Sequence, residues 1–215
     1  MALRNRVDPW GQLRAIAARG TLLGNRGVLH NPRGEIVAPW RTTAWITCRL
    51  TWKGRKRVVM SPGRYTELFF LDEATAFSAG HRPCAECRRA RFREFKAAWL
   101  AANPNLIKSS APPIAEIDRV LHTERAHAGG RKKFYEEELG ALPDGTMIDV
   151  QGVAYLLWGE RLLRWSFAGY TGVGDPLPPR QPVQVLTPAS VVQTFRAGFR
   201  PEVHDSARAA LAGRP

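Results

Sequence analysis

Two cysteines three residues apart, Cys84 and Cys87, are the residues best suited to chemistry in this 215-residue sequence. They lie in the stretch Gly80-His81-Arg82-Pro83-Cys84-Ala85-Glu86-Cys87-Arg88-Arg89. A turn followed by a helix lets both sulfurs of such a pair point at one metal ion, and Zn²⁺ takes thiolate ligands at about 2.3 Å. The chain has one further cysteine, Cys48, and His81 lies just before the pair. We therefore predict a zinc site formed by Cys48, His81, Cys84 and Cys87.

The positive charge of the chain is large and unevenly distributed. The formal net charge is +13. Residues 1–96 contain 19 Lys and Arg against 7 Asp and Glu, whereas residues 97–215 contain 13 against 12. Such an excess favours a polyanionic partner, and we expect nucleic acid, DNA before RNA. The expected phosphate contacts are the basic residues around the cysteines: Arg49, Lys53, Arg55, Lys56, Arg57, Arg82, Arg88 and Arg89.

A second group of polar residues suits acid–base chemistry. Asp118 and His122 are four residues apart on a predicted helix and therefore share one of its faces. Glu124 lies close by, and Lys132 and Lys133 are candidate phosphate partners. The group is either a catalytic site that acts on a nucleic acid or nucleotide, or the polar face of a structural helix. The sequence leaves open whether the protein is an enzyme.

Local patterns predict the elements that position these residues. Cys48 lies in a strand over residues 44–52, followed by a basic turn over 53–56 and a returning strand over 57–60. A third strand is predicted over 65–70. Helices are predicted after Asp8-Pro9, over 73–79 with Asp72 as N-cap, over 83–102, over 114–127 and over 134–139.

From residue 142 the pattern changes to strands, over 146–150, 153–158 and 161–167, joined by two-residue turns that predict an antiparallel meander. Residues 170–182 are predicted to be irregular, a last helix follows Thr187-Pro188, and the tail from Arg208 is predicted to be frayed. We predict an α+β fold with a basic metal-binding region, 1–103, and a helix plus meander region, 114–215. The second region is either a separate unit or part of the same core.

The sequence contains no run of about 20 apolar residues, and its first residues lack an apolar signal core. Three cysteines with one closely spaced pair suit metal binding in a reducing compartment better than disulfide bonds. We therefore expect a cytoplasmic protein.

Residues 41–88 resemble the amino-terminal zinc domain of the Ada family of DNA repair proteins. The shared features, in that domain's order, are Arg41-Thr42-Thr43, Cys48-Arg49, Glu73-Ala74, Gly80, Arg82-Pro83-Cys84 and Cys87. In that family four cysteines hold zinc, and the first of them accepts a methyl group from a DNA methylphosphotriester. The resemblance puts Cys48 at the acceptor position, with Cys84 and Cys87 as the last two ligands. The family's second cysteine corresponds to Trp52 here, and residues 97–215 have no counterpart.

Together these features predict a zinc-dependent nucleic-acid-binding protein that acts in DNA repair or processing. One alternative is an enzyme with its site around Asp118 and His122, a nuclease, glycosylase or transferase. A second is methyl transfer to Cys48. We favour nucleic-acid binding over methyl transfer, because replacing one thiolate ligand by a neutral imidazole makes the remaining sulfurs poorer nucleophiles. A third is a protein–protein module in which zinc is purely structural.

Overall fold

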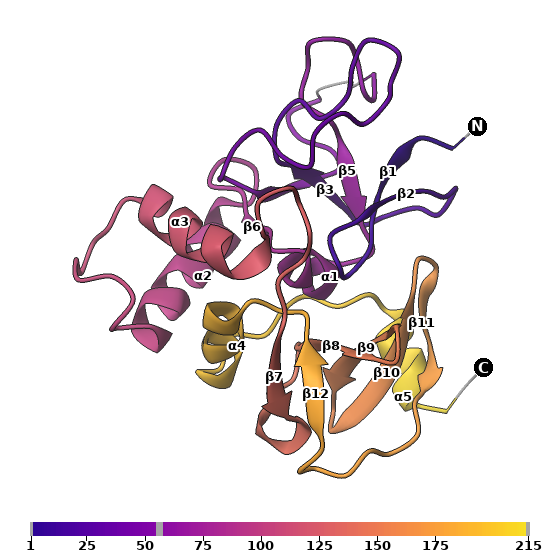
Figure 1. Ribbon diagram of the computed structural model, residues 1–215, viewed down its shortest axis with the longest axis vertical. Coiled ribbons are helices and arrows are strands. Elements are labelled where there is room, and N and C mark those ends of the chain that lie inside the picture. The colour runs from indigo at the N-terminus through magenta and orange to yellow at the C-terminus, as the bar shows by residue number, and fades with distance from the viewer. Residues whose placement is uncertain (1, 55–57, 214–215) are drawn as a thin grey trace.

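The computed structural model describes residues 2–54 and 58–213, which form two sheets with helices between and beside them (Figure 1). The first sheet has six strands in the order β2-β1-β5-β3-β4-β6. Two of its pairings, β1 with β5 and β4 with β6, are parallel. Its strands are β1 (Arg4–Val7), β2 (Leu13–Ala15), β3 (Leu22–Asn25), β4 (Ile46–Arg49), β5 (Leu68–Phe70) and β6 (Arg82–Pro83).

The second sheet also has six strands, in the order β11-β10-β9-β8-β12-β7. The predicted meander is confirmed. Both of its turns, Gln151-Gly152 and Gly159-Glu160, have positive φ at both positions, as tight two-residue hairpins require. The strands are β7 (Tyr135–Glu138), β8 (Met147–Val150), β9 (Val153–Trp158), β10 (Arg161–Ser166), β11 (Gly169–Val173) and β12 (Pro182–Val185).

The helices are α1 (Glu73–Ser78), α2 (Arg89–Ala102), α3 (Ile114–Arg125), α4 (Ala189–Arg196) and α5 (Ser206–Leu211), with a 3-10 turn at Leu139–Ala141. The α+β prediction is therefore confirmed. Helix α1 is buried along its whole length and lies between the two sheets (Figure 1). Its predicted cap is also confirmed, because an Asp72 carboxylate oxygen accepts a hydrogen bond from the Thr75 N–H at 2.8 Å.

The predicted helix after Asp8-Pro9 is wrong, since this segment forms a turn and then β2, which pairs with the preceding strand β1. The Asp8 carboxylate does not cap a helix. It accepts from the Gln12 N–H at 2.9 Å and pairs with Arg14 at 2.9 Å, and both contacts close the turn. Gly11, at φ +77°, supplies the left-handed backbone that this turn needs.

Three further expectations are wrong in the C-terminal part. Residues 134–139 do not form a helix, because Tyr135–Glu138 pairs with Pro182–Val185 as strand β7. Strand β11 (Gly169–Val173) covers the first residues of the segment expected to be irregular, whereas residues 174–181 are irregular as predicted, and α5 replaces much of the expected frayed tail. Strand β7 is fixed by a partner distant in sequence and α5 by packing on β11, neither of which a local pattern reveals, whereas β11 extends the meander by pairing with its neighbour β10.

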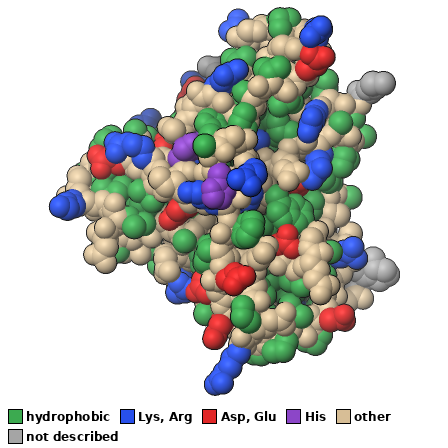
Figure 2. Space-filling model, viewed as in Figure 1, with side chains coloured by type: hydrophobic (Ala, Val, Ile, Leu, Met, Phe, Trp, Pro, Cys, Tyr) green, Lys and Arg blue, Asp and Glu red, His purple; other side chains and the backbone are tan. Residues whose placement is uncertain are grey.

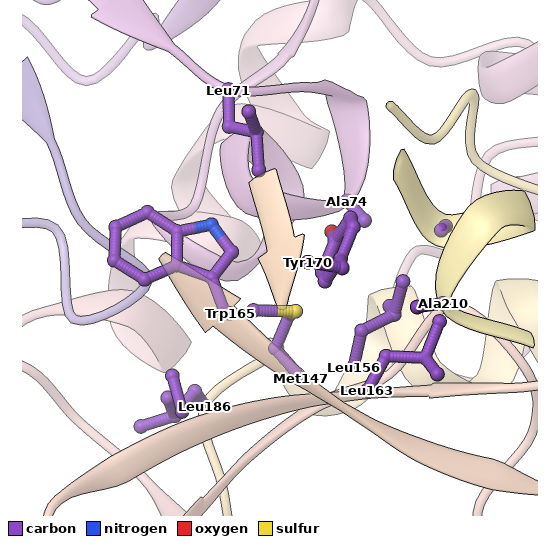
Figure 3. Close-up of a cluster of buried hydrophobic side chains, with 11 residues drawn as sticks. Leu71, Ala74, Met147, Leu156, Leu163, Trp165, Tyr170, Leu186 and Ala210 are labelled. Atoms are coloured by element: carbon purple, nitrogen blue, oxygen red, sulfur yellow. The ribbon is translucent and has the colours of Figure 1, made fainter. Parts of the chain in front are cut away.

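The hydrophobic interior draws on both regions of the chain. In one cluster Leu71 and Ala74, beside and within α1, pack with side chains of the second sheet such as Met147, Leu156 and Leu163 (Figure 3). A second cluster joins helices α1, α2 and α3 to α4 through Phe77, Phe95, Trp99, Ile117, Leu121, Val191, Phe195 and Phe199. Two of the buried clusters therefore contain side chains from both predicted regions of the chain.

In the described part of the chain, none of the helices combines the length and apolar composition that crossing a bilayer requires.

Candidate metal centre

Three cysteine sulfurs meet at one point of the first sheet. The Sγ atoms of Cys48, Cys84 and Cys87 all lie within 4.8 Å of one another. The parallel pairing of β4 with β6 places Thr47 opposite Pro83, and the Cys84 N–H donates to the Thr47 carbonyl at 2.9 Å. The next residue of each strand, Cys48 and Cys84, is thereby brought alongside the other. The predicted meeting of the three cysteines is confirmed.

The turn that follows β6 directs backbone N–H groups at the sulfurs. The N–H of Glu86 lies 3.4 Å from Cys84 Sγ. The N–H of Cys87 also donates to Cys84, and the N–H of Arg49 donates to Cys87. Helix α2 begins two residues after Cys87, so its positive N-terminal end lies close to the sulfurs. Donors and a helix N-terminus of this kind favour thiolate over thiol.

The three thiols differ in acidity. A hydrogen bond from Cys48, helped by the N–H groups of Cys87 and Glu86, lowers the pKa of Cys84 to about 5. The pKa of Cys48 is raised, because its thiol donates to Cys84 and because it is largely buried. The pKa of Cys87 is raised mainly by burial. The arrangement therefore favours ionisation of Cys84 over the other two thiols, whereas a bound divalent ion would keep all three sulfurs ionised.

The geometry fits a tetrahedral thiolate site. Three sulfurs that each lie about 2.3 Å from one tetrahedral ion are about 3.8 Å from each other. The Sγ atoms of the three cysteines lie within 4.8 Å of one another, which is compatible with that separation. Within residues 2–54 and 58–213, no fourth His, Cys, Asp or Glu belongs to this group. The described residues therefore offer three ligands, and an ion held by them would have its fourth position open to solvent or to a bound molecule.

His81, which we predicted as the fourth ligand, lies elsewhere. Its buried ring packs against Trp45 and Phe70, with ring centres 5.1 Å and 4.7 Å apart. Residues an odd number apart in a strand point to opposite faces, so a ring packed on Trp45 is directed away from Cys48. Neither ring nitrogen of His81 has a hydrogen-bond partner in the described structure. Burial and nearby cations lower its pKa well below the usual value.

Two of the predicted phosphate contacts, Arg82 and Arg88, are buried in ion pairs. Arg82 binds both carboxylate oxygens of Asp118, each at 2.7 Å. Arg88 contacts Glu73 and Glu202, each at 2.8 Å. Since both guanidinium groups are held inside the protein, the prediction that they contact a phosphate chain is corrected.

The other predicted contacts are at the surface or outside the described residues. Arg49, Lys53 and Arg89 are exposed, and Arg49 and Lys53 both lie over the ring of the half-buried Trp52, at 5.9 Å and 5.6 Å. Arg55, Lys56 and Arg57 lie in the part of the chain that the structure does not describe.

The side chains of the predicted acid–base group form hydrogen bonds and ion pairs within the protein. Both oxygens of the buried Asp118 are taken by Arg82. Glu124 binds the N–H and hydroxyl of Ser190 at the start of α4. His122 Nδ1 accepts from Arg125 at 3.0 Å, and burial, followed by the charges of Arg125 and Lys133, lowers its pKa. Lys133 donates to the Thr123 carbonyl. No pair of these residues forms a catalytic dyad.

The sequence analysis missed a cluster of buried cations on the other side of Trp45. The guanidinium groups of Arg26 and Arg125 lie 4.6 Å and 4.0 Å from the Trp45 ring centre. Burial lowers the pKa of Arg26 to about 10, of Arg125 to about 9 and of Lys132 to about 7. Lys132 was named from the sequence as a candidate phosphate partner, but nothing local indicated that Arg26 and Arg125 lie close to it.

This cluster predicts a specific pH dependence of stability. The folded-state pKa of Lys132, about 7, lies below its unfolded value of about 10.4, so between these values the unfolded chain binds more protons. Stability should therefore rise with pH through this window, by at most about 1.4 kcal/mol per pH unit from this residue. We expect Lys132→Met to flatten the curve of unfolding free energy against pH, measured by urea denaturation from pH 7 to 10. Lys133→Met is the control, and parallel curves for wild type and Lys132→Met would contradict the prediction.

No protein-family model, curated protein or solved structure matches this chain in the comparisons.

Proposed function

We propose that this protein binds one Zn²⁺ through Cys48, Cys84 and Cys87 and uses the basic surface beside that centre to bind nucleic acid. The meeting of three sulfurs within 4.8 Å carries the proposal. Soft thiolate ligands select zinc over the oxygen-preferring ions Mg²⁺ and Ca²⁺, and a tetrahedral sulfur site suits zinc or iron–sulfur chemistry. The order of motifs shared with the Ada zinc domain supports the choice of zinc.

Nucleic acid is proposed as the partner because of the charge and the side chains next to the centre. Arg49 adjoins Cys48 in sequence, and Arg89 is the first residue of α2, directly after the cysteine turn. Arg49 and the exposed Lys53 both lie over the half-buried ring of Trp52, and Arg89 is a third exposed cation next to the cysteine turn. Cations bind phosphates and an aromatic ring stacks on bases, so this combination suits a single strand or a strand end.

The distribution of charge over the molecule also favours this partner. In the view of Figure 2, basic side chains are spread over the upper part, formed mainly by the first sheet and its loops, while several acidic side chains lie over the second sheet. An extended anion would therefore be attracted to the part of the molecule that carries the three cysteines.

We propose binding, not methyl transfer, as the role of the centre. Three thiolates around a divalent ion give a net charge of −1, compared with −2 for the four-thiolate site of the Ada family. The sulfur of Cys48 is then less electron-rich and a weaker nucleophile. The open fourth position suits a water molecule or a ligand atom of a bound partner.

The proposal predicts salt-dependent nucleic-acid binding that depends on two surface cations. We expect a labelled oligonucleotide to bind with an affinity that falls steeply as salt rises, measured by fluorescence anisotropy with single-stranded DNA, duplex DNA and RNA of equal length. Arg49→Gln and Lys53→Gln should each reduce the slope of log affinity against log salt by about one. Arg164→Gln, at an exposed arginine of β10, is the matched control.

Two results would overturn the nucleic-acid proposal. One is an affinity that does not respond to salt, because phosphate contacts release counterions. The other is an equal loss of affinity in Arg49→Gln and in Arg164→Gln, which would show that overall charge and not the surface beside the cysteines determines binding.

A further inference from the structure

A cavity of about 440 Å³ lies between the first strands and the loop after α3. One part of its lining is apolar, with Leu13, Ile36 and Ala38, and the other part is cationic. The cationic lining residues are Arg4, Arg26, Arg131 and Lys132. No acidic side chain belongs to the lining. The volume falls within the usual range for small-molecule sites, roughly 300–1,000 Å³.

Arg26, which lines the cavity, has an N–H donor without a partner among the described residues. Arg26 is 4% exposed, and its Nη2 donates to the Gly11 carbonyl at 3.0 Å. Its Nε is buried and has no partner among the described residues. Leaving a buried charged donor unpaired is costly, so a native arginine in this state indicates a ligand that the protein alone does not supply.

The charge of the cluster is not neutralised by the protein. In the described structure, neither Arg26 nor Lys132 nor Arg125, which lies behind them, forms an ion pair with a carboxylate. The two carboxylates that act on them electrostatically are already engaged, since Asp8 is bound by Arg14 and Asp118 by Arg82. Arg26 and Arg125 are buried, and the half-buried Lys132 donates only to the neutral Ser78 carbonyl, so these cations beside the cavity favour an anion inside it.

We propose that this cavity binds the phosphate group of an organic phosphomonoester, with the phosphate at Arg26 and Lys132 and the organic part against the apolar wall. A guanidinium and an ammonium group together match the charge and the hydrogen-bond geometry of a phosphate dianion. The cavity exceeds what a lone phosphate fills, and the wall formed by Leu13, Ile36 and Ala38 suits a nonpolar or planar body. A nucleoside monophosphate, free or at the 5′ end of a strand, has this composition.

This site is separate from the metal centre in residues and chemistry. None of the three cysteines lines the cavity. Phosphomonoester binding does not require zinc or the surface residues Arg49 and Lys53, so either proposal can fail while the other holds.

Isothermal titration calorimetry with five ligands tests the proposal. The probes are inorganic phosphate, adenosine, adenosine 5′-monophosphate and a 5′-phosphorylated single strand compared with its 5′-hydroxyl form. We expect the monophosphate to bind at least about tenfold more tightly than adenosine, because its phosphate forms charge-assisted hydrogen bonds. Preference for the phosphorylated strand over the hydroxyl form would assign the phosphate to a strand end, and preference for the free nucleotide would assign it to a small molecule.

Two surface variants test the location without disturbing the core. Val37 lines the cavity and is 56% exposed, so Val37→Trp should fill its mouth and weaken monophosphate binding about tenfold or more. Leu106→Trp, at another exposed apolar residue outside the cavity, is the control. Arg131→Gln, at an exposed lining residue, should also weaken binding, and Arg119→Gln on α3 should not.

Equal affinities for adenosine and its monophosphate would overturn the proposal. So would a Val37→Trp variant that binds the monophosphate as tightly as Leu106→Trp does. Cys84→Ser and the Arg49→Gln/Lys53→Gln double variant should retain monophosphate binding, and loss of binding in folded samples of both would place the phosphate at the metal centre instead.

Discussion

Adding Zn²⁺ to the metal-free protein is expected to raise its melting temperature by about 10 °C. A ligand that binds only the folded state at about 1,000 times its Kd stabilises it by about 4 kcal/mol. For a chain of this length, each kcal/mol raises the melting temperature by roughly 2–4 °C. The physical cause is that only the folded chain holds the three sulfurs within 4.8 Å of one another, where one ion can bind all of them. Differential scanning calorimetry in chelator and in buffered zinc measures the shift, with the zinc content of the purified protein as a second readout.

Matched variants show which side chains hold the ion. Cys84→Ser should abolish both the bound zinc and the thermal shift. His81→Phe should retain both, because the His81 ring packs on Trp45 and Phe70 and lies outside the sulfur group. A wild-type protein with one melting temperature in chelator and in zinc would contradict the metal proposal. Loss of zinc in His81→Phe would restore histidine as a ligand.

Asp118→Ala is expected to destabilise the protein by about 3–5 kcal/mol, as measured by urea denaturation. Asp118 and Arg82 have side chains only 4% and 5% exposed, and they form two hydrogen bonds of 2.7 Å. Removing the carboxylate leaves a buried guanidinium without its counter-charge. Most of the expected loss of stability is therefore the cost of leaving the Arg82 charge buried and unpaired. The net contribution of the ion pair is the smaller part.

A double variant separates these two contributions. Arg82→Met combined with Asp118→Leu removes both charges and retains apolar volume, so we expect it to recover most of the stability that Asp118→Ala loses. If the unfolding free energy of Asp118→Ala lies within about 1 kcal/mol of the wild-type value, the ion pair is not the structural element that the geometry indicates. Asp118 would then again be a candidate for the catalytic role that the sequence suggested.

Elements fixed by local chemistry were predictable from the sequence. Asp72 begins α1 because its carboxylate meets an N–H three residues later, and this depends only on neighbouring residues. Gln151-Gly152 closes a hairpin because two residues with positive φ match the twist of the strands they join. The site prediction worked for the cysteines because the turn after β6 orients Cys84 and Cys87 locally.

Features that depend on distant partners were not predictable. Asp8 carries the pattern of a helix cap, but the residues after it return as β2 along β1, which itself pairs with β5 more than 60 residues later, so a strand replaces the helix. Arg82 and Arg88 belong to the same run of cationic residues as Arg89. They are buried, however, because they pair with carboxylates of α1, α3 and Glu202. The charge excess of residues 1–96 therefore overstates the positive charge on the surface. His81 was placed in the metal site by its distance along the chain, whereas strand alternation decides which face it occupies.

The contacts of Asp72 and Glu73 have a consequence for the order in which this chain folds during synthesis. The other oxygen of Asp72 accepts from the Tyr170 hydroxyl at 2.8 Å and from the His204 N–H at 3.0 Å, and a Glu73 oxygen accepts from the Glu202 N–H at 2.9 Å. These donors lie 98 to 132 residues later in the chain, so they leave the ribosome well after α1 does. Until they arrive, the carboxylates of Asp72 and Glu73 lack part of their partners and cannot be buried at low cost. We therefore expect the nascent N-terminal half to remain incompletely folded until residues 170–204 have emerged, which exposes it to chaperones during that part of translation.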